Sequence, residues 1–177
     1  MNMKKYFLLT ILIAAAVSAF GREPEKGYRG FVDLDLLAGN AYHNDDTSGF
    51  DKRDGLTMFG ISTTHGYQFN SHLFAGAGIM YAGGFGTNLL PVFADVRYDA
   101  KWNRFTPFGD LRIGYDITNE SLYFSPNVGY RFNWGRKVNL NVGLGLTIKG
   151  YKRSDILIGG NRIAYDPMFN LRVGIDF

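Results

Sequence analysis

The sequence of 177 residues contains no cysteine and only three histidines. The absence of cysteine excludes disulfide bonds, thiolate catalysis and zinc sites built on cysteine. It also excludes a lipid anchor attached to an N-terminal cysteine. The histidines, His43, His65 and His72, show no spacing typical of metal ligands. We therefore expect neither a metal nor another cofactor.

A strong excess of charge of one sign is also missing. The formal net charge is +3 at pH 7, and two of the positive charges belong to Lys4 and Lys5 near the start of the chain. Without its first residues the chain is close to neutral. Proteins that bind nucleic acid usually carry a clear basic excess, so nucleic acid is not an expected partner.

The sequence has a single long apolar run, from Tyr6 to Val17. Lys4 and Lys5 precede it, and the small residues Val17-Ser18-Ala19 follow the rule for a cleavage site. A membrane-spanning helix needs about 20 apolar residues, which is more than this run provides. The pattern predicts a secretory signal peptide at residues 1–19, then a short periplasmic leader at 20–27 and a folded domain at 28–177.

What the chain has in abundance is an alternation of apolar residues with polar residues or glycine. In the last nine residues, Phe169, Leu171, Val173, Ile175 and Phe177 share one parity, and polar residues or glycine occupy the other. A period of two is typical of a strand with one apolar face. Eight segments show it, and none shows a helical period: 28–39, 55–69, 73–82, 89–99, 105–116, 122–132, 138–149 and 163–177.

The even number of strands favours a membrane barrel. Their length favours it too, because most of these segments are close to the ~9–11 residues that cross a bilayer at a tilt. Short turns near 70–72, 100–104 and 133–137 alternate with longer connections near 40–54 and 150–162. This predicts an all-β fold, an eight-stranded antiparallel up-and-down transmembrane β-barrel. Both ends of the domain then lie on the short-turn, periplasmic side.

The apolar parity predicts the lipid-facing wall. Its aromatic residues gather at strand ends with aliphatic residues between them, and two aromatic girdles around an aliphatic band are typical of such a wall. Phe59, Tyr81, Tyr115 and Phe124 belong toward the outer side. The predicted rim aromatics are Phe177, Phe169, Tyr28, Tyr67, Phe69, Tyr98, Phe105, Tyr130 and Phe132. The final strand with its last residue Phe177 also resembles the terminal strand of bacterial outer-membrane barrels, and this resemblance implies that Phe177 is an insertion signal.

The polar parity predicts the lumen, where charges of opposite sign should pair. We expect Arg172 and Asp33 in one ion-pair cluster, because they lie at similar heights on the last and first strands. Five acids against five bases leave no net field to select ions, and eight strands leave little room for a pore. The predicted network comprises Asp33, Asp35, Asp95, Arg97, Asp110, Arg112, Arg131, Lys149, Arg172 and Asp176.

Three alternatives remain open. A soluble lipocalin-type barrel also has eight strands but turns its apolar face inward around a ligand. A narrow porin-like channel for small solutes would use the same membrane barrel with an open lumen. A lipid-A-modifying barrel enzyme would need a His with a Ser and a carboxylate, and His65-Gly66-Tyr67 lacks a neighbouring Ser. We therefore expect a protein that is not an enzyme.

The whole domain resembles the small eight-stranded bacterial outer-membrane barrels of the OmpA-transmembrane and OmpX type. The stretch Leu90–Tyr98, with Pro107-Phe108 and Gly114-Tyr115, is similar to the "outer membrane protein beta-barrel domain" or porin family proteins of Bacteroidota. The resemblance implies a cell outer membrane location and a structural or surface-interaction role with a plugged lumen. It implies outer-membrane lipid, lipopolysaccharide and the insertion machinery as partners of a monomer.

Overall fold

The computed structural model describes residues 26–43, 52–84, 87–100, 105–133, 138–155 and 160–177. The signal peptide predicted at 1–19 and most of the leader predicted at 20–27 lie outside these residues. No helix in the described part of the chain is long and apolar enough to cross a membrane.

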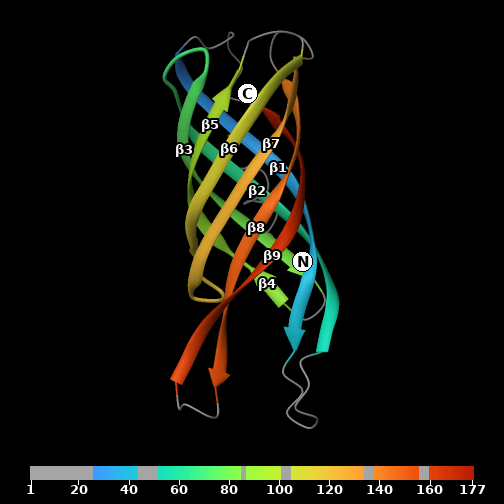
Figure 1. The fold of residues 1–177 in the computed structure, drawn as a ribbon. Helices are drawn as coiled ribbons and strands as arrows, with labels where there is room; N and C mark the ends of the chain where they lie inside the picture. Colours follow the sequence, from blue (N-terminus) through green and yellow to red (C-terminus); the bar gives the residue numbers. More distant parts are fainter. Residues whose placement is uncertain (1–25, 44–51, 85–86, 101–104, 134–137, 156–159) are drawn as a thin grey trace, which may run out of the picture.

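The described residues form nine β-strands that twist around a common axis (Figure 1). They are β1 (Gly27–His43), β2 (Lys52–Gln68), β3 (Leu73–Gly84), β4 (Thr87–Leu89), β5 (Pro91–Asp99), β6 (Phe105–Asp116), β7 (Ser121–Asn133), β8 (Asn139–Asp155) and β9 (Gly160–Asp176). Every neighbouring pair is antiparallel, and β1 pairs with β9 to close the barrel.

The nine strands make an eight-stranded barrel, because β4 and β5 together occupy one position beside β3. Their register against β3 is continuous and is interrupted only around Leu90. The amide of Leu90 donates to the Asp116 carboxylate at 2.9 Å, and Pro91 has no N–H to donate. The predicted fold is therefore confirmed, with its fourth strand, 89–99, broken at Leu90 and extended to Thr87.

The two ends of the barrel differ. We call the end where β1 begins and β9 ends the terminal rim, and the opposite end the loop rim. At the terminal rim the β2–β3 turn is tight, because Asn70 Oδ1 accepts the amides of His72 and Leu73, each at 2.8 Å. Beyond the loop rim the β1–β2 and β8–β9 ribbons project and separate (Figure 1), since the β1–β9 pairing ends at Gly39 and Met168.

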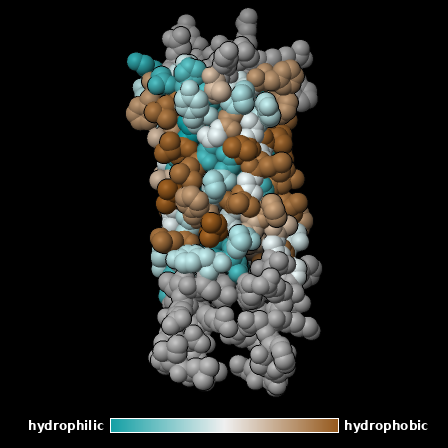
Figure 2. All heavy atoms as spheres, in the orientation of Figure 1, coloured by the Kyte–Doolittle hydropathy of each residue, from teal (hydrophilic) through white to brown (hydrophobic). Residues whose placement is uncertain are grey.

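The outer wall is apolar, as the alternation predicts. Buried and exposed residues alternate at every position of β5, and large apolar side chains face outward on the barrel strands. Leu34 is 62% exposed at mid-strand on β1, and Figure 2 shows hydrophobic residues along the visible wall. A soluble barrel would bury this face, so the wall excludes the lipocalin-type alternative and fits lipid.

Aromatic side chains border this wall at the terminal rim. Tyr28 and Tyr67 are cross-strand partners, and the Phe105 and Phe132 rings meet edge to face with centroids 5.5 Å apart. Phe177 exchanges backbone hydrogen bonds with Gly30 at 2.9 and 3.1 Å, which extends the β1–β9 ladder by one residue. Its ring lies over Gly30, where a Cβ would collide with it, so glycine makes room at the closing seam.

The remaining predicted rim aromatics divide between the two halves of the wall. Phe69, Tyr98 and Tyr130 lie near the terminal rim, and all three are exposed. Phe169 is also exposed, but it pairs with Ala38 and Leu146 in the loop half of the wall.

Candidate functional site: the layered lumen

The lumen begins at the terminal rim with a cluster of buried charges, which we call the rim cluster: Arg29, Arg97, Asp99, Arg131 and Asp176. Arg29 on β1 reaches Asp99 on β5 and Asp176 on β9, both at 2.7 Å. Arg97 and Arg131 also approach Asp99, at 2.9 and 3.4 Å. Asp99 is thus shared by three guanidinium groups, which favours its charged form through charge-assisted hydrogen bonds.

Two amide side chains also form hydrogen bonds with the charged groups of the rim cluster. Gln68 accepts from Arg29 at 2.9 Å, and Asn141 accepts from Arg97 at 2.7 Å. Asn141 also donates to Asp176 at 2.9 Å. With Arg131 on β7, the rim cluster is therefore a connected polar network that links β1, β2, β5, β7, β8 and β9 across the lumen.

A phenylalanine layer follows, made of Phe31, Phe74 and Phe108. All three side chains are buried, and the rings of Phe31 and Phe74 meet edge to face with centroids 5.0 Å apart. The Arg97 guanidinium lies 3.6 Å from the centre of the Phe108 ring, which is a cation–π contact. Phe31 shares the inward parity of Asp33 and Asp35, so the inner face is not uniformly polar.

The next layer is the central cluster of buried charges: Asp33, Asp35, Asp95, Asp110, Arg112 and Arg172. Arg112 binds Asp33 at 2.6 Å and Asp95 at 3.3 Å. Arg172 binds Asp35 at 2.9 Å and Asp110 at 3.0 Å. Arg112 and Asp33 come from β6 and β1, which lie on opposite sides of the barrel, so this ion pair crosses the lumen.

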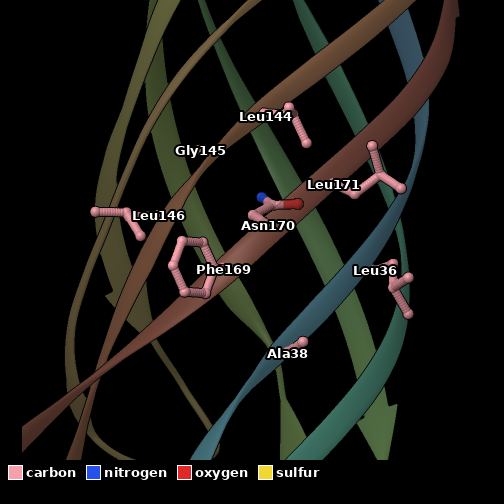
Figure 3. Close-up of a pocket in the computed structure, with 8 residues that line it drawn as sticks. All are labelled: Leu36, Ala38, Leu144, Gly145, Leu146, Phe169, Asn170 and Leu171. Carbon is pink, nitrogen blue, oxygen red and sulfur yellow. The ribbon is translucent and has the colours of Figure 1, made fainter.

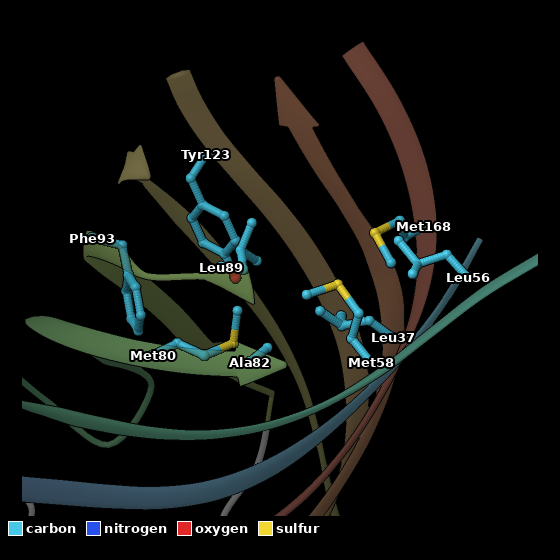
Figure 4. Packing of buried hydrophobic residues seen from close by; sticks show 9 residues of the cluster. All are labelled: Leu37, Leu56, Met58, Met80, Ala82, Leu89, Phe93, Tyr123 and Met168. Atoms are coloured by element: carbon cyan, nitrogen blue, oxygen red, sulfur yellow. The ribbon is translucent and has the colours of Figure 1, made fainter. Parts of the chain in front are cut away.

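Toward the loop rim much of the lumen becomes hydrophobic, while Ser125, Thr147 and Asn170 keep a hydrogen-bonded polar strip on β7, β8 and β9. Figure 4 shows side chains from β1, β2, β3, β4, β5, β7 and β9 that converge on the same space. Arg112 lies 4.7 Å from the centre of the Phe93 ring, so this layer packs directly on the central cluster. We call it the apolar cluster: Leu37, Leu56, Met58, Met80, Ala82, Leu89, Phe93, Tyr123 and Met168.

A smaller polar group lies still nearer the loop rim. Lys149 on β8 and Asp166 on β9 are buried cross-strand partners. Asp116 is buried beside the β6–β7 turn, where it accepts the amide of Thr118 at 3.1 Å and the side-chain amide of Asn119. Lys149 therefore lies apart from the rim and central clusters.

All ten predicted lumen residues are buried, and nine of them lie in the rim and central clusters. Arg172 and Asp33 share the central cluster through Arg112, Ser62 and Asp35, but they do not contact each other directly. The sequence reasoning missed four further buried charges: Arg29, Asp99, Asp116 and Asp166. They continue the inward parity of their strands, and that signal could have found them.

These additions change the charge balance. The buried charged side chains of the described residues are eight aspartates and six bases, whereas the sequence predicted five of each. The rim cluster has one more base than acids, and the central cluster has two more acids than bases. The lumen is therefore divided by sign along its axis and is not uniformly neutral.

His65 lies on the outer wall near the terminal rim, and hydroxyl groups flank it. Its Nε2 lies 2.9 Å from Thr63 Oγ1, and its Nδ1 hydrogen-bonds with the hydroxyl of Tyr28. Thr63 thus supplies a hydroxyl group two residues before the histidine, although no Ser is adjacent to His65 in the sequence. Thr63 Oγ1 also donates to the Phe31 carbonyl at 3.3 Å.

The outer wall carries a shallow apolar recess of about 440 Å³ over β1, β8 and β9 (Figure 3). It is lined by Leu36, Ala38, Leu144, Gly145, Leu146, Phe169, Asn170 and Leu171. No group of His, Asp or Glu side chains within the described residues is arranged to hold a metal ion.

Comparison with known proteins agrees with this geometry. The sequence profile of the outer membrane protein beta-barrel domain matches residues 7–177. The crystal structure of Neisserial surface protein A has a TM-score of 0.62 at 13% identity and covers 85% of this chain and 97% of its own. OprG from Pseudomonas aeruginosa has a TM-score of 0.52 at 13% identity, covering 88% and 96%. None of the curated proteins compared matches the sequence.

Proposed function

Because the chain belongs to the outer membrane protein beta-barrel domain family, we propose that it is a closed structural barrel of the outer membrane whose loop rim serves surface interactions. The carrying observation is the filling of the lumen, layer after layer, by the rim cluster, the phenylalanine layer, the central cluster and the apolar cluster. An eight-stranded barrel has an interior that side chains can fill completely.

Two features of the filling support a closed state over the alternative of a narrow channel. The ion pair between Arg112 and Asp33 spans the lumen at 2.6 Å, which leaves these charges little freedom to bind a passing ion. The apolar cluster lies next to it, beside the buried polar side chains of Ser125, Thr147 and Asn170, and hydrophobic constrictions oppose conduction by excluding water.

The contacts around His65 support a role without catalysis. An acyl-transfer site needs a nucleophile activated by a base that a third group orients. Here the Thr63 hydroxyl donates to a backbone carbonyl, and the third partner is the phenol of Tyr28 in place of a carboxylate. We expect lipid A and phospholipids to have identical mass spectra in cells with and without the protein, and a mass change that depends on His65 would favour an enzyme.

The proposal includes an orientation. Short turns face the periplasm in outer-membrane barrels, so the terminal rim is assigned to the periplasm and the projecting β1–β2 and β8–β9 ribbons to the cell surface. Lipopolysaccharide and outer-membrane lipid are then its neighbours, and Phe177 is available to the insertion machinery before the seam closes. We keep a cleaved signal peptide at 1–19 and a monomeric state as part of this proposal.

The lack of cysteine makes the orientation directly measurable, because a single introduced thiol is unique. Thr118 lies exposed in the β6–β7 turn at the loop rim, and Lys26 lies exposed before β1 at the terminal rim. A membrane-impermeant maleimide should label Thr118→Cys in intact cells and Lys26→Cys only after the outer membrane is permeabilised. The reverse pattern, or equal labelling of both in intact cells, would refute the proposal.

A further inference from the structure

The rim and central clusters together contain an unequal number of charges. Their guanidinium groups are five, from Arg29, Arg97, Arg112, Arg131 and Arg172. Their carboxylates are six, from Asp33, Asp35, Asp95, Asp99, Asp110 and Asp176. An uncompensated buried charge is strongly unfavourable, and such a group is neutralised by taking up a proton where no partner is available.

We propose that the central cluster is a proton-binding site and that Asp95 carries the proton as a neutral carboxylic acid. A single proton makes the two clusters electrically neutral. This inference does not depend on the surface interactions proposed for the loop rim, but it rests on the closed lumen, which keeps water away from Asp95.

The hydrogen bonds single out Asp95 among the six carboxyl groups. Its Oδ1 is buried and has no hydrogen-bond partner within the described residues. Its Oδ2 contacts Arg112 Nε at 3.3 Å, which is long for a charge-assisted bond. In Asp35, by contrast, one oxygen accepts from Arg172 at 2.9 Å and the other from Ser62 at 3.0 Å.

The other carboxylates are also better supplied with donors. Both oxygens of Asp99 contact arginines, and so do both oxygens of Asp110. Asp176 accepts from Arg29 at 2.8 Å and from Asn141 at 2.9 Å. Asp33 holds the Arg112 guanidinium at 2.6 Å, the shortest ion pair of the central cluster. Arg112 is thereby drawn to Asp33 and away from Asp95.

The charged groups around Asp95 do not make up for this. The charges that act on it are Arg112, its cross-strand partner on β6, Asp110 on the same strand, Arg172 on β9, and Arg97 of the rim cluster two residues along β5. Its partner on β3 is Gly76, which brings no side-chain donor. Asp110 repels a charged Asp95, while Arg172 is already engaged with Asp35 and Asp110.

The layers on either side keep solvent from replacing the missing partner. The phenylalanine layer lies between the central cluster and the terminal rim, and the apolar cluster lies on the loop-rim side, together with the buried and hydrogen-bonded side chains of Ser125, Thr147 and Asn170. Asp95 itself is 3% exposed. A cation in place of the proton would need several oxygen ligands, and the described residues hold no group of three acidic or histidine side chains that could supply them.

Infrared spectroscopy of the barrel in lipid bilayers tests the proposal on the wild-type protein. A neutral carboxyl group gives a C=O stretching band that a carboxylate lacks, and this band shifts in D2O and with 13C-labelled aspartate. We expect the band at neutral pH in the wild type and in the control Asp116→Asn, and its loss in Asp95→Asn. Absence of the band in the wild type, or its survival in Asp95→Asn, would overturn the proposal.

A pair of unfolding measurements gives a second test that needs no spectral assignment. Asparagine has the shape of a neutral aspartic acid, so Asp95→Asn should leave the urea midpoint within experimental error of the wild type. Asp99→Asn removes a charge shared by three arginines and should lower the midpoint clearly. An equal drop in both variants would show that Asp95 is charged, and a wild-type midpoint that rises with sodium concentration would assign the site to a cation.

Discussion

At the scale of single residues, the stability of this barrel depends on buried guanidinium groups that each bind more than one carboxylate. Arg172 is 3% exposed and contacts both Asp35 and Asp110 within 3.0 Å. A buried ion pair adds little net stability compared with an apolar pair, but removing one partner leaves the other charge uncompensated. The stability lost in a substitution therefore comes mainly from the charges that the removed side chain leaves uncompensated.

Arg172→Ala leaves Asp35 and Asp110 without their shared cation. We expect the free energy of unfolding to fall by about 3–5 kcal/mol, as for other broken buried pairs. Urea unfolding in lipid vesicles, followed by the loss of the compact form on unheated gels, measures this change. Lys26→Ala removes an exposed cation and should leave the midpoint unchanged. An Arg172→Ala midpoint equal to that of the wild type would show that water or another group compensates these aspartates.

Two glycines of β6, Gly114 on the inner face and Gly109 on the outer face, make a second prediction at this scale. At Gly114 on β6, a Cβ would collide with the carbonyl oxygen of Val92 on β5, whereas at Gly109 on the same strand the nearest atom is 3.8 Å away. Gly114→Ala should therefore destabilise the barrel by about 1–3 kcal/mol, as overpacking does. Gly109→Ala should change stability by less than about 0.5 kcal/mol. Equal urea midpoints for the two variants would contradict this account of the inner face.

The pairing of individual side chains was less predictable than their burial. Parity alone places Arg172, Asp33 and Asp35 inside, but the stagger between strands decides that Arg172 binds Asp35 while Arg112, from the opposite side, binds Asp33. Arg29 and Asp99 were missed because they lie at strand ends, where the sequence resembles a rim or a turn. Their inward parity continues that of Asp33 and Asp95, so the alternation followed to the end of each strand would have placed them inside.

At the scale of elements, each of the eight strand positions of the barrel is a membrane-spanning unit with one lipid face, and the alternation in the sequence was sufficient to locate it. β6 covers the predicted residues 105–116, and the other strands begin or end within a few residues of the prediction except β8, which continues to Asp155. The extensions of β8 and β9 beyond the loop rim form a two-stranded ribbon. The sequence at 150–162 lacks a one-sided apolar pattern, so it was predicted as a loop.

The lipid face makes a prediction that depends on depth. Leu34 is 62% exposed at the middle of the part of β1 that pairs with both neighbours, and Leu122 is 61% exposed at the start of β7 near the loop rim. An arginine on the lipid face of a barrel is unfavourable by about 2–4 kcal/mol at the midplane and by about 0–1 kcal/mol near the interface.

We therefore expect Leu34→Arg to lower the free energy of unfolding in lipid vesicles by about 2–4 kcal/mol and Leu122→Arg by at most about 1 kcal/mol. Denaturant titration of the two refolded variants measures the difference. Because the two leucines are equally exposed, exposure alone would predict equal effects. Such equality would contradict the assignment of this wall to the bilayer.

At the scale of the whole molecule, the barrel has an apolar exterior and a layered interior that contains buried charged side chains, which is the reverse of a soluble globular protein. The outer wall supplies the apolar surface, while charges, aromatic rings and aliphatic side chains succeed one another along the axis inside. The apolar cluster was not predicted, because most of its members lie on the parity that holds polar residues or glycine elsewhere in the same strands. Leu37 follows Asp35 and Phe93 precedes Asp95 on that inner face. A period of two in the sequence assigns each residue to the outer or the inner face, but it does not show how the inner face divides into charged and apolar layers along the barrel axis.

The central claim is that these layers close the lumen, and the current through single barrels in planar bilayers tests it most directly. We predict no discrete openings from the refolded wild-type protein under salt and voltage conditions in which a general porin conducts steadily. Refolding is checked on the same sample by the shift in mobility of unheated protein on gels. A stable open current from that sample would contradict the closed lumen and establish the narrow channel instead.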